Sequence, residues 1–233
     1  ASQASGGLAM VPGLSKPNQF RYRHHLTHDE GVIDQSLRTF IKMKAVMERS
    51  RSMQRLTDDP RLKRKLGNDF TVRMGYGLHL GWAVEGAVGS KHKVDATYLS
   101  PNVNMASRLE AATKQYSVNI LMSHTVYEGM SAELQGECRE IDRVTVKGSD
   151  QPIGLYVHLP TEAPKLREEE MVEFQRLWDE AFHLYVSGTD WSRALELIAE
   201  CKEILPHDGP SDVIRGVIEK HSAKTGDVPA DWP

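Results

Sequence analysis

Residues 70–90 read FTVRMGYGLHLGWAVEGAVGS, and this stretch argues against a helix at the centre of the chain. It mixes β-branched, aromatic and apolar residues with many glycines, which weaken helices and mark strands that bend or lie against another backbone. We predict a central strand near residues 70–80, a turn at Gly81 and a second extended segment that ends at Gly89. A phosphate-binding loop is not indicated, because neither G-x-G-x-x-G before a helix nor G-K-[ST] occurs.

The segments that follow alternate between extended and helical patterns. Residues 91–99 predict a third strand. Ser100 and Pro101 then begin a helix that extends to about Tyr116, since Ser is a favoured N-cap and Pro a favoured first helical residue. The stretches that come next predict a strand, a short helix and two further strands: SVNILMS, HTVYEGMSAEL, CREIDRVTVKG and QPIGLYVHL. The order β-β-α-β-α-β-β predicts an α+β fold in which helices pack on a sheet.

The N-terminal part of the chain and its C-terminal part differ from this central region. Residues 1–33 show no sustained period and are predicted to be tail or loop, and an amphipathic helix is predicted from Asp34, its N-cap, to about Leu56. Residues 161–170 form a proline- and charge-rich linker.

Residues 171–233 predict a small helical extension. Apolar stripes of the kind that form a core run along its first two helices, at Trp178, Ala181, Leu184 and Tyr185 and at Ala194, Leu195, Ile198 and Cys201. The extension resembles one tetratricopeptide-type hairpin with a cap. Since a stable array needs more repeats, we expect it to dock on another surface, and a protein partner for these helices is one candidate.

Composition limits the class of protein. With 39% hydrophobic and 26% charged residues and a net charge of -3, the chain is typical of soluble globular proteins and gives no support for nucleic-acid binding. Cys138 and Cys201 match neither a metal-ligand nor a disulfide pattern, which favours a reducing compartment. No apolar run approaches the roughly 20 residues that span a bilayer. We predict an intracellular location, with attachment to a membrane or larger assembly through other parts left open.

The helix after Ser100 carries two polar side chains that need an explanation. Asn104 and Arg108 lie four residues apart and therefore share one helical face, whereas Val103, Ala106 and Leu109 lie on another face that is available for packing. The pair is either a solvated i,i+4 pair or a set of donors that converge on a polyanionic ligand or a developing negative charge. Spacing alone favours the solvated pair.

The wider context changes this balance, because residues 34–160 resemble the C-terminal half of a class III nucleotidyl cyclase catalytic domain. The stretches that carry the resemblance occur in order: the glycine-rich double strand, K-x-D-x-T…VN-x-ASRLE, and DRV-x-VKG-x-x-x-P. The resemblance implies a partial ferredoxin-like domain from an adenylate cyclase that converts ATP to cyclic AMP and pyrophosphate. It also implies a second cyclase domain, in a homodimer or heterodimer, because active sites of this family form between two domains.

The resemblance implies roles for individual residues. Asn104 matches the Asn that helps to hold the ribose in the transition state, and Arg108 matches the Arg that stabilises charge on the phosphates. Thr97 lies at the position that reads the purine, and Asp95, on the same strand face, is a secondary candidate for that role. Lys147, in VKG, matches the Lys that contacts the terminal phosphates. Such fixed donors suit a reaction that moves charge on a triphosphate.

Two departures from the family pattern bear on activity. Ser100-Pro101-Asn102 stands where the family usually has Gly followed by Asp or Asn, although it supplies good capping chemistry. Neither metal-binding Asp motif, F-x-D-[IV]-x-G-F-[ST] or G-D-x-[FLM], occurs in the sequence, and the purine-contacting Lys near the second motif is missing too. We therefore expect the Mg²⁺ or Mn²⁺ ligands to lie outside this chain, and the chain alone to be inactive.

More than one class of function stays open at this point. In the first, the chain supplies the purine and transition-state half of an adenylate cyclase site, whose other half lies upstream, has been cut away or is carried on a separate chain. In the second, it is a non-catalytic scaffold or subunit of a larger assembly. The missing metal motifs favour the scaffold, whereas the retained Asn104, Arg108 and Lys147 favour the enzyme. A nucleotide-binding regulator would need only the base pocket and the phosphate contacts.

Overall fold

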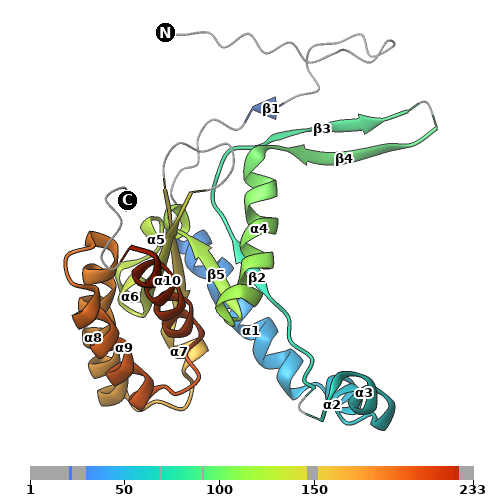
Figure 1. Cartoon of the computed structure of the whole chain (residues 1–233). Helices are drawn as coiled ribbons and strands as arrows, with labels where there is room; N and C mark the ends of the chain where they lie inside the picture. The colour runs from blue at the N-terminus through green and yellow to red at the C-terminus, as the bar shows by residue number, and fades with distance from the viewer. Residues whose placement is uncertain (1–20, 23–29, 69, 91, 146–151, 226–233) are drawn as a thin grey trace, which may run out of the picture.

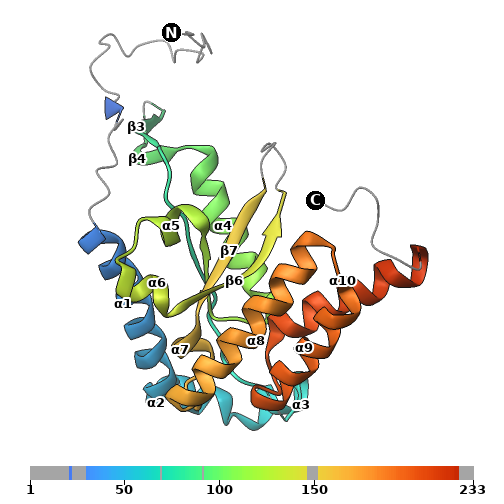
Figure 2. The ribbon, with the colours of Figure 1, turned by 90° about the vertical axis from the view of Figure 1, so that its left-hand side faces the viewer.

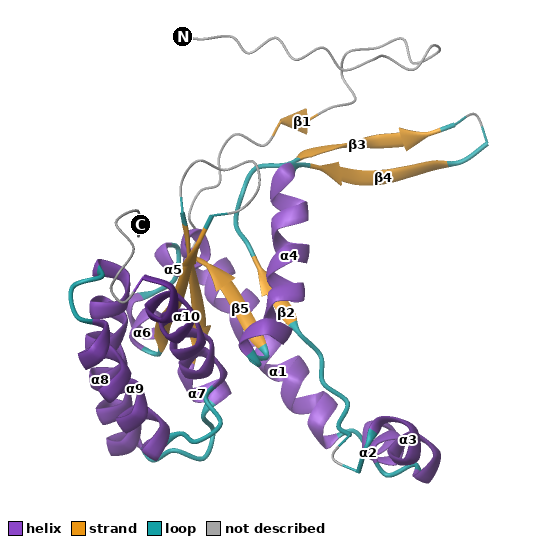
Figure 3. Cartoon of the chain, in the orientation of Figure 1, coloured by secondary structure: helices purple, strands orange, loops and turns teal. Residues whose placement is uncertain are grey.

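A computed structural model of the chain describes residues 21–22, 30–68, 70–90, 92–145 and 152–225 (Figure 1). Its strands and helices give a mixed architecture in which a sheet is covered by helices on both faces (Figure 3). This arrangement confirms the α+β class that the sequence predicted.

The strands described here form two sheets. The larger sheet has the order β2 (Tyr76–Leu78), β5 (Ile120–Ser123), β7 (Ile153–His158), β6 (Cys138–Val144). β2 runs parallel to β5, whereas β5 with β7 and β7 with β6 are antiparallel. The smaller sheet is antiparallel and has the order β1 (Arg21–Tyr22), β3 (Val84–Gly89), β4 (Val94–Leu99).

Helices precede, connect and follow these strands. Those before β6 are α1 (Glu30–Arg49), α2 (Arg51–Thr57), α3 (Pro60–Leu66), α4 (Pro101–Tyr116), α5 (His124–Glu128) and α6 (Ala132–Gly136). Those after β7 are α7 (Leu159–Glu162), α8 (Glu168–Ser187), α9 (Trp191–Ile204) and α10 (Gly209–Thr225). Within the described residues, no helix combines the length and the apolar character needed to cross a membrane.

The larger sheet separates two hydrophobic cores, and the alternation along β5 shows how. Ile120 and Met122 are buried in a core that includes Leu37 of α1, and the residue between them, Leu121, is buried in a core with α4 and α8–α10. Successive strand side chains point to opposite faces, so an all-apolar strand is expected where both faces are covered. Figure 2 shows α1 on one side of the sheet and α8, α9 and α10 on the other.

Helix α4 lies directly on strand β2, because a glycine of β2 lets the two backbones approach. A Cβ atom at Gly77 would stand 2.4 Å from the carbonyl oxygen of Ala106 and 2.5 Å from the backbone nitrogen of Glu110. No side chain fits at such distances, so Gly77 sets how closely α4 can pack. The glycines of residues 70–90 were predicted to allow a close backbone approach, and this contact confirms it.

A buried ion pair joins the C-terminal helices to the sheet. The guanidinium of Arg139, on β6, donates a hydrogen bond to the carboxylate of Asp208, and both side chains are almost completely buried. The guanidinium also lies over the rings of Phe174 and Trp178, 4.7 and 4.3 Å from their centroids. Asp208 in turn accepts from the backbone nitrogen of Ser211 at 3.0 Å, inside the first turn of α10. The pair therefore links β6, α8 and α10.

The apolar stripes predicted for residues 171–233 face this same core. Trp178, Ala181 and Tyr185 of α8 are buried, as are Ala194 and Ile198 of α9. The indole nitrogen of Trp178 also donates to the carbonyl oxygen of Glu140 on β6, at 2.7 Å. The surface on which these helices dock is thus the sheet of the same chain. The likeness to a tetratricopeptide hairpin stays a prediction.

Several element boundaries differ from the prediction. The first helix begins at Glu30, so Asp34 is not its N-cap; inside the helix, the Asp34 carboxylate accepts from the backbone nitrogen of Ser131 at 3.0 Å. The predicted helix also ends early, because α1 stops at Arg49 and α2 begins at Arg51. The contact of Asp34 depends on a partner 97 residues away in sequence, which a local pattern does not contain.

Two further segments behave differently from their predictions. The strand predicted over residues 70–80 is limited to Tyr76–Leu78, since only these residues pair with β5. The predicted linker, residues 161–170, overlaps the end of α7 and the start of α8, and Ala163 within it is buried. The proline lies between the two helices and a run of glutamates begins α8, so the predicted linker is reduced to the short connection from α7 to α8.

The close packing of α4 on β2 predicts a stability change. Gly77→Ala should lower the free energy of unfolding by about 1–3 kcal/mol, because the added methyl group overpacks the contact with Ala106 and Glu110. Chemical denaturation measures the change. As a control, a Cβ at Gly216 in α10 meets nothing within 4 Å, so Gly216→Ala should stabilise by up to about 1 kcal/mol. A Gly77→Ala variant as stable as the wild type would contradict this packing.

The buried ion pair predicts a larger loss. Asp208→Asn should lower the free energy of unfolding by about 3–5 kcal/mol, because it leaves the Arg139 guanidinium buried without a counter-charge. The matched control is Asp212→Asn, which removes exposed ion pairs to Lys202 and Arg215 and should change stability by at most about 1 kcal/mol. Equal effects of the two substitutions in thermal or chemical denaturation would exclude the proposed link.

Candidate active site

The N-terminus of α4 is fixed by local capping, as predicted. Ser100 has extended backbone angles, its hydroxyl accepts from the backbone nitrogen of Asn102 at 3.0 Å, and Pro101 is the first helical residue. The same hydroxyl donates to the carbonyl oxygen of Trp82 at 2.5 Å, and the side-chain amide of Asn102 donates to that oxygen at 2.8 Å. The first turn of α4 is therefore bound to the segment that leads from β2 into β3.

Asn104 and Arg108 lie on an exposed side of α4, within its first two turns. Leu109, next to Arg108, is buried in the core with the C-terminal helices, so one side of α4 is held while the other stays open. Val103 was expected to pack with Leu109, but its side chain is 47% exposed. The open side thus carries Asn104 in the first turn, where the helix dipole favours an anionic group, and the positive charge of Arg108 in the middle of the helix.

Thr97 and Asp95 lie on β4, in the β3–β4 hairpin that projects from the rest of the chain at the start of α4 (Figure 1). Thr97 pairs with Gly86 and is partly buried; Asp95 pairs with Val88, and its side chain is 64% exposed and forms an ion pair with Lys93 at 3.1 Å. A strand advances about 3.3 Å per residue, so Thr97 is about 10 Å and Asp95 about 16 Å along the strand from Ser100. Thr97 is therefore nearer to Asn104 and Arg108 than Asp95 is.

The remaining predicted site residue and the metal ligands are not found in the described structure. Lys147 lies outside the described residues. Among the described residues, no group of three or more His, Cys, Asp or Glu side chains is arranged to hold a metal ion. The part of the chain that the structure describes thus places Asn104, Arg108 and Thr97 around the start of α4 but contains no such cluster for a divalent cation.

The hairpin and the start of α4 also expose large apolar side chains. Each of them is at least 45% exposed: Trp82, Val88, Val94, Tyr98, Leu99 and Val103. We call this set the hairpin patch. By strand alternation Val94 and Tyr98 lie on one face of the hairpin and Val88 and Leu99 on the other, so exposed apolar side chains cover both faces of this projecting element, which marks it as a surface that contacts another molecule.

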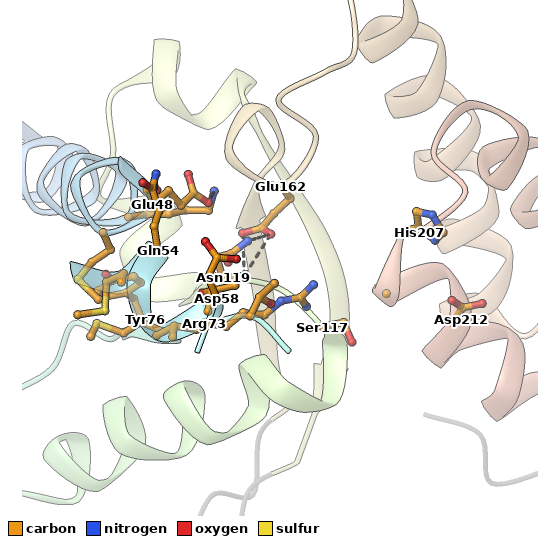
Figure 4. Close-up of a pocket in the computed structure, with 18 residues that line it drawn as sticks. Glu48, Gln54, Asp58, Arg73, Tyr76, Ser117, Asn119, Glu162, His207 and Asp212 are labelled. Carbon is orange, nitrogen blue, oxygen red and sulfur yellow. Dashed lines mark hydrogen bonds and ion pairs between the residues drawn. The ribbon is translucent and has the colours of Figure 1, made fainter. Parts of the chain in front are cut away.

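A separate cavity of about 800 Å³ lies at the other end of α4 (Figure 4). It is lined by residues that include Lys44, Arg73, Glu162 and His207, which come from α1, the segment before β2, α7 and the α9–α10 connection. The carboxylate of Glu162 accepts from the backbone nitrogens of Asn119 and Ile120 at 3.0 and 3.1 Å, and its burial raises its pKa. The sequence analysis missed this cavity, because its walls come from segments that no local motif connects.

Comparisons with known proteins agree on one family. The family model described as "Adenylate and Guanylate cyclase catalytic domain" matches residues 13–159, which include part of the predicted tail. The chain is 36% identical over 132 residues to an adenylate cyclase of Anabaena cylindrica, a match that covers 55% of this chain and 24% of that protein. It is 29% identical over 150 residues to the "Adenylate cyclase, terminal-differentiation specific" of Dictyostelium discoideum, covering 60% of this chain and 7% of that protein.

Among solved structures, a bacterial light-regulated adenylyl cyclase is similar at a TM-score of 0.44 and 18% identity, over 76% of this chain and 40% of that one. The chain spans about a quarter or less of the length of the two curated relatives described above.

Proposed function

This chain belongs to the family of adenylate and guanylate cyclase catalytic domains, and we propose that it supplies the purine and transition-state half of an adenylate cyclase site. The observation that carries the proposal is the open side of α4, where a capped and firmly packed helix presents Asn104 and Arg108. A short amide and a long guanidinium on one face of a firmly held helix are placed to meet charge that develops in a transition state.

The proposed reaction is the conversion of ATP to cyclic AMP and pyrophosphate. The ribose 3′-oxygen bonds to the α-phosphorus, the bond from that phosphorus to the bridging oxygen of the β-phosphate breaks, and the 3′-hydroxyl proton is lost to solvent or a base. Asn104 would hold the ribose, and Arg108 would offset the negative charge that grows on the phosphate oxygens. Thr97, with Asp95 as the secondary candidate, would read the purine, and Lys147 would contact the terminal phosphates.

A divalent cation is the remaining requirement. Mg²⁺ or Mn²⁺ would neutralise charge on the phosphates, but the described residues of this chain do not form a site for it. We infer that the ligands come from another domain or chain, and we assign none of this chain's described residues to the metal.

The hairpin patch supports a second cyclase domain as the partner. The described residues supply candidate polar groups but no cluster of metal ligands, and the patch offers apolar area beside these groups, from Trp82 through Val103. A domain seated on this patch would bury these side chains and could bring its own metal ligands to α4. The partner of the reaction and the occupant of the patch would then be the same domain.

A different protein partner for α8–α10 stays a narrower proposal. The stripes predicted for docking are buried against the sheet, so a partner would contact the outer side of these helices. That side is charged: Glu180 lies 3.8 Å from Arg176 and 4.0 Å from Arg193. We also propose that the protein acts on the cytoplasmic side. This location follows from ATP as the proposed substrate and from the predicted reducing compartment.

Substitutions on α4 test the function. In the full protein that contains this chain, Asn104→Ala and Arg108→Ala should each lower cyclic AMP formation with Mn²⁺ by about 10²–10³-fold, because each removes a group that meets developing charge. The melting temperature should change little, since both side chains are exposed. Lys114→Ala, which removes an exposed cation from the last turn of the same helix, is the control and should keep wild-type activity. Wild-type rates in both site variants would leave the non-catalytic scaffold as the better hypothesis.

Substitution in the hairpin patch tests the partner. Tyr98→Asp places a charge on a side chain that is 59% exposed, and it should weaken association with the second cyclase domain by about tenfold or more. Val172→Asp, at a 66% exposed position on α8, should leave association unchanged. Sedimentation velocity over a concentration series measures both. If Tyr98→Asp associates like the wild type, the partner does not bind this patch.

A further inference from the structure

One buried network connects the sheet to the first turn of α4. His79 directly follows strand β2 and is partly buried. Its Nδ1 lies 2.9 Å from the hydroxyl of Ser123, the last residue of β5, and its Nε2 lies 3.1 Å from the side-chain oxygen of Asn102. The ring thus reaches from the ends of two neighbouring strands to the helix that carries Asn104 and Arg108.

The hydrogen bonds of Asn102 determine which nitrogen of His79 carries the proton. The side-chain nitrogen of Asn102 donates to the carbonyl oxygen of Trp82 at 2.8 Å, so the atom that faces His79 is the oxygen, which can only accept. Nε2 must therefore carry a hydrogen. In a neutral ring Nδ1 is then an acceptor, and the Ser123 hydroxyl is placed to donate to it.

The Ser123 hydroxyl has a second possible partner besides His79. Ser123 lies 2.8 Å from the hydroxyl of Thr125, which lies 3.0 Å from the carbonyl oxygen of Leu80. The four contacts that run from Asn102 through His79, Ser123 and Thr125 to Leu80 need four hydrogens, whereas a neutral ring and two hydroxyls supply three. Ser123 therefore donates to either His79 or Thr125 and not to both. Burial lowers the pKa of His79, the hydrogen bond to Asn102 raises it by less, and the nearby His124 lowers it further, so this pKa lies below its usual value. The ring is therefore neutral at pH 7, and the acceptor oxygen of Asn102 keeps its hydrogen on Nε2.

The space around Asn102 leaves its side chain little choice. A Cβ atom at Gly81 would stand 2.3 Å from the side-chain carbon of Asn102, so the chain between β2 and β3 closes over the amide. An amide held on one side by this backbone and on the other by an imidazole is fixed in position. Through Asn102, the start of α4 is fixed as well.

We propose that His79 is a positioning residue for the cyclase reaction, and that its Nε2 hydrogen bond to Asn102 sets the place of Asn104 and Arg108 on α4. His79 does not contact substrate in this proposal. Its catalytic part rests on the function proposed above, whereas its hold on α4 can be measured in this chain alone.

A matched pair of substitutions separates the bond to Asn102 from the bond to Ser123. The amide nitrogen of Gln reaches about as far as Nε2, so His79→Gln keeps a donor for Asn102. The amide of Asn reaches only as far as Nδ1, so His79→Asn keeps a partner for Ser123 and loses Asn102. Hydrogen exchange in peptides from residues 100–110 should be about 3- to 10-fold faster in His79→Asn, the effect of one lost hydrogen bond, and near wild type in His79→Gln. Exchange in α9 should not change in either variant.

Two more measurements decide the remaining points. The ¹⁵N shifts of the His79 ring at pH 8 should report a hydrogen on Nε2, and this hydrogen should stay on Nε2 in Ser123→Ala, because Asn102 still requires a donor there. In the full cyclase, His79→Asn should lower kcat about 10-fold or more with a smaller change in KM for ATP, and His79→Gln should restore it.

The outcomes distinguish the two proposals. Unchanged exchange in His79→Asn, or a hydrogen on Nδ1 in the wild type, would overturn the role of His79. If the wild type makes no cyclic AMP with any partner domain, the proposed function fails and with it the catalytic part of this inference. The exchange and ¹⁵N data would still decide whether His79 holds α4.

Discussion

The contact between α4 and β2 is the constraint on which the candidate site depends. At Gly77 the backbone of β2 meets the backbone of α4 at Ala106 and Glu110, and Leu109, which lies between these two residues, is buried in the core with α8–α10. A helix held this closely has little freedom to rotate or slide. Its direction therefore determines that Asn104 and Arg108 face outward and that its first turn meets the start of the hairpin. Ser100, His79 and Asn102 then fix the end of the helix that the packing alone leaves free.

What could be predicted from the sequence were the features that local chemistry decides. Ser100 and Pro101 form the cap expected of them, the stripe through Trp178 and Tyr185 is buried, and the glycine-rich strand permits a close approach. The failures share a physical cause, because each depends on a distant partner. Asp34 looks like an N-cap but binds the backbone of Ser131, and the cavity beside Glu162 is assembled from separate segments.

The candidate site itself was predictable only in part. The spacing of Asn104 and Arg108 placed them on one face, but their exposure depends on which side of α4 meets the sheet. That Thr97 lies at the base of a projecting hairpin, with Asp95 farther out, follows from the pairing of β3 with β4 rather than from any motif. Asn104, Arg108 and the hairpin patch are all exposed to solvent, whereas a complete site would cover them. We interpret this surface as one wall of a site shared between two domains.

The Arg139–Asp208 pair has a consequence for how such a chain can change during evolution. Arg139 lies on β6, the edge strand of the larger sheet, and Asp208 lies directly before the last helix, α10, while Phe174 and Trp178 complete the surroundings of the pair. Recombination that joined the strands to a different C-terminal segment would leave a guanidinium without a counter-charge and would expose Ile141, Leu155 and Val157 to water. These helices are therefore not an exchangeable module. Sequence change on either side of the pair has to be matched on the other, so the two regions should be inherited together.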